Sequence, residues 1–232
     1  FANTWVMGAN GPELRALQAP MVAVNMPIYL QLACGMLCNN TYGDNVSLNF
    51  GAFNMVSNGA AVADAALTGT ATYSVMKGTE LVGTSLNNLT DAGTYTITYT
   101  GGLASGNTAY VINPGAAVTW TVNKRTLTVG LEGTSANPLT KVYDGNRDLA
   151  LSTQNFLLGN FAPGTSQGGT ISQTNGVFNS PNVATANLVT ASLSAANLSV
   201  TGGALASNYV LPTSVSKAGT ITPKALAITT ND

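Results

Sequence analysis

Hydrophobic and polar residues alternate along much of this chain, and an alternation with a period of two predicts β-strands. Over residues 94–100, tyrosine and isoleucine alternate with threonine, and over residues 118–122, valine and tryptophan do the same. Because successive side chains of a strand point to opposite faces, one face of each strand is expected to be core. The other face is expected to carry threonine hydroxyls.

The longest alternation lies near the N-terminus, in a stretch without any charged residue between Arg15 and Asp44. Residues 19–38 are apolar enough to suggest a membrane span, but the period of two favours a strand over a helix and predicts no membrane insertion. At about 3.3 Å per residue, residues 22–38 would extend about 56 Å, whereas a usual strand is about 17–20 Å long. Part of the stretch is therefore expected to lie elsewhere. Its even positions are Val22, Val24, Met26, Ile28, Leu30, Leu32, Cys34, Met36 and Cys38.

Three sequence patterns recur in the same order, which indicates two tandem repeats. The turn Tyr42-Gly43-Asp44-Asn45 returns 101 residues later as Tyr143-Asp144-Gly145-Asn146. The pair Tyr110-Val111 returns after 99 residues at 209–210, and residues 122–127 return after 99 residues at 221–226. The predicted organisation is an N-terminal arm (1–25), a first β repeat domain (26–125), a second (126–225) and a C-terminal tail strand (226–232).

The apolar positions change parity at equivalent places in the two repeats. Past Lys124-Arg125 they pass from even at Val122 to odd at Leu127, and at the matching place in the second repeat they pass from odd at Ile221 to even at Leu226. A strand that leaves one sheet and enters the next explains this change. The many short strands predict an all-β protein of two tandem immunoglobulin-like β-sandwich domains. A β-grasp-like fold is the alternative, because residues 58–67 are rich enough in alanine to form one helix.

Composition excludes several classes of function. The chain has no histidine, and only 7% of its 232 residues are charged, with a net charge of −1. A general base, proton shuttle or metal site that needs imidazole is therefore excluded, and nucleic-acid binding lacks the positive charge that it requires. The 31 threonines, 25 asparagines and 25 glycines are typical of strands and tight turns. We expect a secreted or cell-surface protein that is not an enzyme.

The repeat motifs resemble a known group of domains. The Tyr-Gly-Asp and Tyr-Asp-Gly turns, the segment 91–95, the pair Asn208-Tyr209 and the closing segment 221–226 look like the MBG and YDG repeats of filamentous-haemagglutinin-like bacterial surface adhesins. The resemblance covers roughly residues 40–230 and leaves residues 1–25 unmatched. It implies secretion, tandem arrangement and a stalk or adhesive role, and it carries no catalytic residue to this chain.

Cys34 and Cys38 are too few for a structural zinc site. On one straight strand their Cα atoms would lie about 13 Å apart, whereas a disulfide needs about 4.4–6.8 Å. Either the strand ends near Cys34 and Gly35 permits a turn that closes a local disulfide, or the thiols stay apart as core residues or as links between chains. We favour the local disulfide.

The few acidic residues do not form a catalytic pair. Asp44 and Asp144 hold equivalent turn positions, so they are expected to lie about a domain length apart, whereas catalytic carboxylates lie within about 10 Å of each other. They are expected to cap their own turns, although a calcium site at a domain junction stays an alternative. We predict no catalytic residue, no metal and no cofactor.

Three classes of function come into consideration for such a sequence. The first is a structural subunit of an extracellular fibre or adhesin stalk that binds copies of itself head to tail, because unfinished strands invite strand addition. The second is a module that binds host or matrix glycans or mucin through loops or threonine faces. The third is an enzyme, for which no catalytic set is present. The predicted self-association residues are Val22, Val24, Met26, Ile28, Leu30, Leu32, Leu226 and Ile228.

Overall fold

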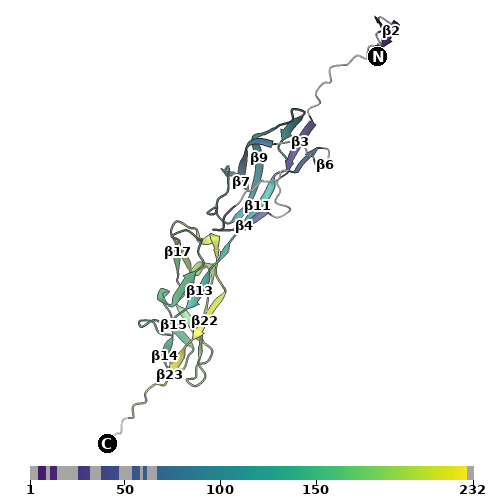
Figure 1. Ribbon diagram of the computed structural model, residues 1–232. Coiled ribbons are helices and arrows are strands. Elements are labelled where there is room, and N and C mark those ends of the chain that lie inside the picture. The colour runs from purple at the N-terminus through teal and green to yellow at the C-terminus, as the bar shows by residue number, and fades with distance from the viewer. Residues whose placement is uncertain are drawn as a thin grey trace. The chain divides into compact units, whose positions relative to one another are not determined.

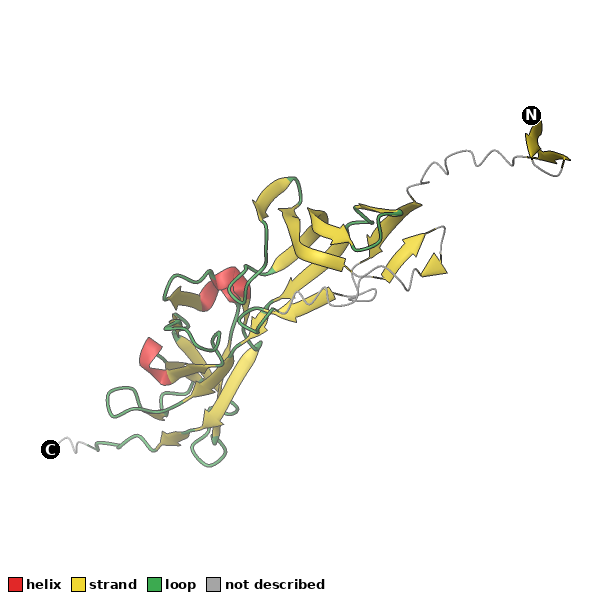
Figure 2. Cartoon of the chain, turned by 45° about the horizontal axis from the view of Figure 1, so that its top comes forward, coloured by secondary structure: helices red, strands yellow, loops and turns green. Residues whose placement is uncertain are grey.

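The computed structural model describes residues 5–8, 11–14, 26–31, 38–46, 54–57, 60–61 and 67–228. Strands supply nearly all of the regular structure, and the helical segments are short 3₁₀ turns, as Figure 2 shows. The predicted all-β class is thereby confirmed. The chain divides into two compact units: the first comprises Phe1–Gly35, Asn49–Ser74 and Ile97–Val118, and the second comprises Met36–Leu48, Val75–Thr96 and Thr119–Asp232.

The first unit contains an antiparallel hairpin and a four-stranded sheet (Figure 1). The hairpin joins β1 (Trp5–Gly8) and β2 (Gly11–Leu14). The sheet has the order β10-β3-β5-β6, formed by β10 (Tyr110–Asn113), β3 (Met26–Gln31), β5 (Asn54–Ser57) and β6 (Ala60–Ala61). Strand β3 therefore has a neighbour on each side, β10 parallel and β5 antiparallel.

The core of the first unit gathers around Ile28, which is completely buried. Tyr99 is also buried there, and six partly buried side chains pack against the pair: Leu67, Ala71, Tyr73, Leu103, Tyr110 and Ile112. The rings of Tyr73 and Tyr99 meet edge to face at 6.2 Å. Burial, and secondarily the charge of Tyr99, raises the pKa of Tyr73 to about 12.

A five-stranded sheet has the order β4-β11-β9-β7-β8, formed by β4 (Cys38–Thr41), β11 (Val118–Asn123), β9 (Gly93–Ser105), β7 (Leu67–Lys77) and β8 (Glu80–Gly83). On β9 the predicted faces are confirmed, because Tyr95, Ile97 and Tyr99 are buried whereas the intervening threonines are exposed or half-buried. On β11 the same holds for Trp120 and Val122, at 7% and 2% exposure.

The second unit contains the remaining strands (Figure 1). Its largest sheet is antiparallel, with the order β15-β18-β19-β22: β15 (Asp148–Ala150), β18 (Asn175–Phe178), β19 (Leu188–Ser192) and β22 (Ser214–Ala218). Two antiparallel pairs are β13 (Thr128–Leu131) with β16 (Phe156–Gly159) and β17 (Gly168–Ile171) with β20 (Leu198–Thr201). Two parallel pairs are β12 (Arg125–Thr126) with β21 (Tyr209–Val210) and β14 (Thr140–Val142) with β23 (Thr220–Thr222).

The core of the second unit draws on most of these strands. Phe178, Ile171, Val189, Ala191 and Leu131 are at most 1% exposed and belong to one cluster of buried residues. The 3₁₀ turns η1 (Thr153–Asn155), η2 (Ala195–Asn197) and η3 (Ala206–Asn208) each lead directly into a strand.

The predicted change of sheet after residue 123 is present in the structure. Strand β11 pairs with β4 up to Asn123, and only Lys124 separates it from β12, which pairs with β21. Val122 and Leu127 are both 2% exposed, so the side chains on either side of the parity change are buried.

The long N-terminal alternation is divided between two strands. Strand β3 ends at Gln31 and β4 begins at Cys38, and the two belong to different sheets. The alternative helix at residues 58–67 falls partly outside the described residues. Within this range, Ala60–Ala61 forms β6 and Leu67 begins β7. No helix in the described ranges is long and apolar enough to span a membrane. The boundaries 26–125 and 126–225 stay predictions.

Candidate functional site

An aromatic cluster in the second unit centres on Tyr42, the residue after β4. Its side chain is 2% exposed, and its ring meets the ring of Tyr209 edge to face, with centroids 5.5 Å apart. The ring of Phe161 also meets the ring of Tyr209 edge to face, with centroids 5.4 Å apart. Gln167 donates a hydrogen bond from Nε2 to the Tyr42 hydroxyl at 3.0 Å. The first predicted repeat turn is thus packed against residues more than a hundred positions later in the chain.

Arg125 fixes the backbone of this turn. Its Nε donates to the Tyr42 carbonyl oxygen at 2.7 Å, and its guanidinium pairs with the Asp44 carboxylate. The Arg125 side chain is 11% exposed, so much of this charge is taken out of water and needs its two partners. Gly43 between them has φ +88°, and an added Cβ would lie 2.6 Å from the Cβ of Ala162. Only glycine therefore fits this position.

Tyr209 and its neighbour Asn208 are both held by hydrogen bonds. The Tyr209 hydroxyl accepts from the Ala162 amide at 3.2 Å and donates to Gln167 Oε1, and burial raises the pKa of Tyr209. Asn208 is 1% exposed. Its Nδ2 donates to Asp91 Oδ1 at 2.7 Å, while its Oδ1 accepts from the Ala92 amide at 2.8 Å. The cluster joins the segments around Tyr42, Arg125 and Tyr209 and forms a structural clamp.

The second repeat turn has the same backbone position as the first. The Tyr42 amide donates to the Asn123 carbonyl at 2.9 Å, directly after the parallel pair β4–β11, and the Tyr143 amide donates to the Thr222 carbonyl at 2.8 Å, directly after the parallel pair β14–β23. The pair Tyr110–Met26 likewise matches the pair Tyr209–Arg125, both parallel. The 99- and 101-residue offsets of the sequence therefore correspond to equivalent strand pairings.

The surroundings of the two turns differ. Tyr143 is 40% exposed, and the preceding Val142 is 57% exposed. Asp144 pairs with Lys141 at 2.7 Å, and this bond, with a further one from the Asn146 amide, lowers the pKa of Asp144. Gly145 has φ +86° with open space around it. The second turn is formed but has no aromatic partner over Tyr143 among the described residues.

The predicted self-association residues have different environments. Ile28 is buried in the core of its own unit, so its side chain does not face another copy; the alternation placed it on the right strand, but its apolar face packs within the chain. Leu226 and Ile228 are 85% and 82% exposed. Met26 and Leu30 belong to β3, and Val22, Val24 and Leu32 lie outside the described residues.

Cys38 is 4% exposed and disulfide-bonded. Its strand, β4, begins at this residue, separate from β3. Cys34 lies outside the described residues, so the local Cys34–Cys38 bridge stays a prediction.

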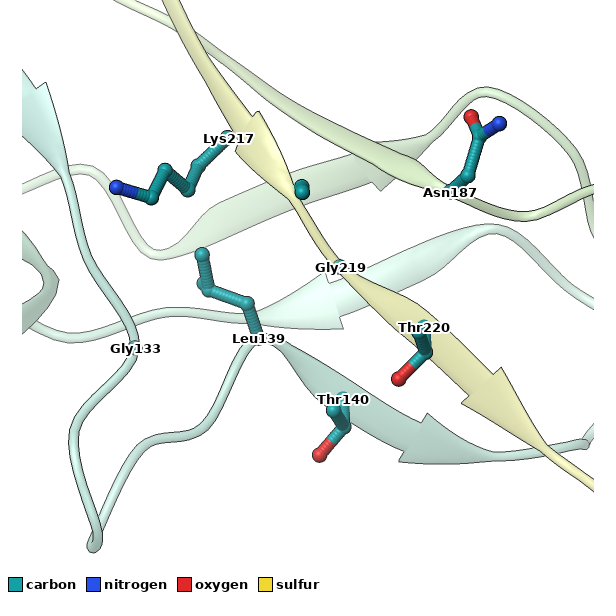
Figure 3. A pocket seen from close by; sticks show the side chains of 8 residues that line it. Gly133, Leu139, Thr140, Asn187, Lys217, Gly219 and Thr220 are labelled. Atoms are coloured by element: carbon teal, nitrogen blue, oxygen red, sulfur yellow. The ribbon is translucent and has the colours of Figure 1, made fainter.

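A shallow hollow of about 470 Å³ lies beside β22 and β14 (Figure 3). Its lining is mostly apolar, and its one charged side chain, Lys217, pairs with Glu132 at 2.8 Å. The lining residues include no acid, hydroxyl–base pair or thiol that could act on a substrate: Gly133, Leu139, Thr140, Asn187, Lys217, Ala218, Gly219 and Thr220. No cluster of metal-ligating side chains occurs in the part of the chain that the structure describes.

Two residues of the clamp could not be predicted from the sequence. Lys124-Arg125 marks the junction and Asn208-Tyr209 belongs to the repeat motifs, but Phe161 and Gln167 lie in a loop with no pattern that links them to Tyr42.

Comparison with known families finds a YDG domain at residues 123–217. The YDG part of the expected resemblance is thereby confirmed for this segment, which begins at the last residue of β11 and includes most of the second unit's strands. No curated protein and no solved structure matches the chain.

Proposed function

We propose that this protein is a structural subunit of an extracellular bacterial fibre or adhesin stalk, which associates head to tail with copies of itself by strand addition. The observation that carries the proposal is the pair Leu226 and Ile228, at 85% and 82% exposure. One repeat earlier the equivalent of Leu226 is Leu127, which is 2% exposed. Exposed apolar residues in a strand-forming sequence favour pairing with the edge of another strand.

The connection between the repeats suits a load-bearing stalk. One residue, Lys124, separates β11 from β12, and Arg125 and Tyr42 clamp the crossing on both sides. A one-residue connection has neither the length nor the glycine and serine composition of a flexible linker, which favours a stalk of tandem modules.

We place the protein outside the cell, among the MBG and YDG modules of filamentous-haemagglutinin-like adhesins. The YDG domain at residues 123–217 and the disulfide at Cys38 support this proposal, because disulfides persist mainly in oxidising compartments. We further propose that both repeats are immunoglobulin-like sandwiches. In the second unit, one buried cluster takes residues from the β13–β16 pair and from the sheet β15-β18-β19-β22, as a two-layer fold requires.

A glycan- or mucin-binding module is the second candidate, and it is favoured by the threonine face of β9. Thr94, Thr96 and Thr100 are exposed, and the Thr100 hydroxyl lies 2.9 Å from that of Thr72. Such a row of hydroxyls can form hydrogen bonds with sugar hydroxyls. Binding of this kind does not require the protein to polymerise.

Electron microscopy and sedimentation of the full chain test the proposal. We expect elongated assemblies that the paired substitution Leu226→Asp and Ile228→Asp abolishes, because strand addition would then bury two charges. Leu157→Asp is the matched control, since Leu157 is also exposed, at 58%, but lies on β16. Full-length protein that stays monomeric at high concentration contradicts the proposal, and retained glycan binding by that monomer supports the second candidate.

A further inference from the structure

We infer that each repeat resists tension along the chain, because tension shears parallel strand pairs that join the beginning of the repeat to its end. This property goes beyond association between copies, since a single chain has it. Its use in the cell rests on the proposed role as a stalk, which transmits tension from one end to the other.

The second repeat shows the arrangement within one compact unit. At its beginning β12 pairs in parallel with β21, and at its end β23 pairs in parallel with β14. Figure 1 shows β14 beside β23 where the chain leaves this unit. The chain therefore enters the repeat through one parallel pair and leaves it through another.

The direction of the strands decides how tension acts on these pairs. Tension pulls β12 from its N-terminal end and β23 from its C-terminal end, whereas the rest of the repeat holds β21 and β14 from the opposite ends. The two strands of each pair are thus pulled along each other, and the evenly spaced hydrogen bonds of the ladder carry the tension together. Strands that are pulled apart at the same end separate one bond at a time, which needs a smaller force.

Hydrogen bonds beyond the ladder lengthen the β14–β23 pair at both ends. Before β14, the Leu139 carbonyl accepts from the Thr220 amide at 3.1 Å, and after β14 the Tyr143 amide donates to the Thr222 carbonyl at 2.8 Å. The Thr222 hydroxyl also donates to the Lys141 carbonyl at 3.3 Å. All of these bonds join the two strands that tension pulls in opposite directions.

The shorter β12–β21 pair is reinforced in the same way. The Leu127 amide donates to the Val210 carbonyl at 2.9 Å, which extends the pair by one residue. On β12 itself, the Thr126 carbonyl accepts from Asn160 Nδ2 at 2.8 Å. The first strand of the repeat is therefore bonded to β21 and to the residue that follows β16.

Buried side chains oppose the sliding of both pairs. Ile221 on β23 is 3% exposed, and Leu127, directly after β12, is 2% exposed. A slip of one residue turns each side chain of a strand to the other face, so sliding has to pull these side chains out of the core. Forced unfolding is governed by the rate of such a step, and not by the equilibrium stability of the repeat.

The first repeat has corresponding pairs. Strand β3 pairs in parallel with β10, and β4 pairs in parallel with β11. Ile28 on β3 is completely buried, as Ile221 nearly is on β23. Resistance to shear is therefore a property of the repeat and does not depend on one junction.

Single-molecule force spectroscopy of the full chain tests the inference by pulling in two directions. Handles are attached through azide-bearing side chains, which do not react with each other. Handles at the exposed positions 124 and 224 place both parallel pairs of the second repeat in shear, and unfolding between them releases up to about 330–360 Å of chain. Handles at the exposed positions 143 and 224 pull on one end of the β14–β23 pair and open it bond by bond.

We expect shear to need at least about twice the force of opening, because several hydrogen bonds of similar strength have to break together. Both geometries use the same fold with the same equilibrium stability, so only the direction of the force differs. Equal forces in the two geometries overturn the inference.

Two matched core deletions locate the resistance. Ile221→Ala and Ile171→Ala remove the same atoms from one buried cluster, but Ile171 lies on β17, outside the parallel pairs. At constant force between positions 124 and 224, Ile221→Ala should raise the unfolding rate at least about tenfold, whereas Ile171→Ala should change it less than about threefold. Equal acceleration by both variants also overturns the inference.

Sedimentation of the same chain separates this inference from the proposed function. A chain that resists shear but stays monomeric supports the inference and contradicts head-to-tail association. A chain that associates but unfolds at equal force in both directions contradicts the inference and leaves the association standing.

Discussion

Replacement of Tyr42 by alanine should strongly destabilise the second unit. The substitution removes a side chain that is 2% exposed, a ring contact with Tyr209 at 5.5 Å and the acceptor for Gln167 Nε2 at 3.0 Å. Burial of an aromatic side chain stabilises by about 1.5–3 kcal/mol, the ring pair adds about 0.5–1.5 kcal/mol, and the hydrogen bond adds about 1 kcal/mol. We expect the free energy of unfolding to fall by about 3–5 kcal/mol, the usual range for large-to-alanine changes in a core.

The repeat provides a matched control in Tyr143→Ala. Tyr143 follows an equivalent strand but is 40% exposed, so its loss should cost about 0.5 kcal/mol or less in the monomer. Tyr42→Phe keeps the ring and should cost about 0.5–1.5 kcal/mol.

Urea unfolding of monomeric protein provides the measurement for these three variants. A Trp5→Phe background leaves Trp120 as the sole tryptophan, and Trp120 is 7% exposed in the same unit as Tyr42. A cost for Tyr42→Ala within 1 kcal/mol of that for Tyr143→Ala would refute the reasoning, because the ring packing would then contribute nothing.

Two further predictions concern a buried amide and a tyrosine hydroxyl. Asn155→Ala should lower the free energy of unfolding by about 3 kcal/mol in urea, because two carbonyls and an amide lose a partner inside the fold; Asn197→Ala, in the equivalent but less buried turn, should cost about 1 kcal/mol or less, and equal costs would contradict this. The raised pKa of Tyr73, about 12 against an ordinary 10, keeps its proton in the folded state, so the associated stability is fully present below pH 10 and is lost as the pH rises to 12. Tyr73→Phe should reduce that alkaline loss in denaturation followed by circular dichroism, and an unchanged pH profile would show that Tyr73 does not cause it.

Local patterns predicted much of the fold because they report directly on burial. The alternation along 94–100 and 118–122 placed Tyr95, Ile97 and Trp120 on buried faces, as the structure has them. The parity change after Lys124 predicted a change of sheet, since a one-residue shift moves every side chain of a strand to the other face. The repeat offsets predicted which strand pairs would be equivalent.

Other features depend on contacts that are distant in sequence. The alternation over 22–38 suggested one long apolar face, but β3 and β4 belong to different sheets, because a period of two does not say where a strand ends. Tyr42 is covered by Gln167 and by the ring pair of Phe161 and Tyr209. This cover requires the loop that contains Gln167 to pack over a turn that lies 125 residues earlier in the chain. A local hydrophobic period carries no information about a contact between segments so far apart in the sequence.

The difference between Tyr42 and Tyr143 shows where such information lies. Both turns have similar sequences and the same backbone hydrogen bond, yet one tyrosine is buried and the other is 40% exposed. The burial of a turn is therefore decided by the neighbour that covers it, and not by the turn's own residues. In a chain of such repeats, stability is a sum of terms within each repeat and terms at each contact between neighbours. The packing of Tyr42 on Tyr209 contributes one such contact term, and this term is the reason why replacement of Tyr42 should cost more than replacement of Tyr143.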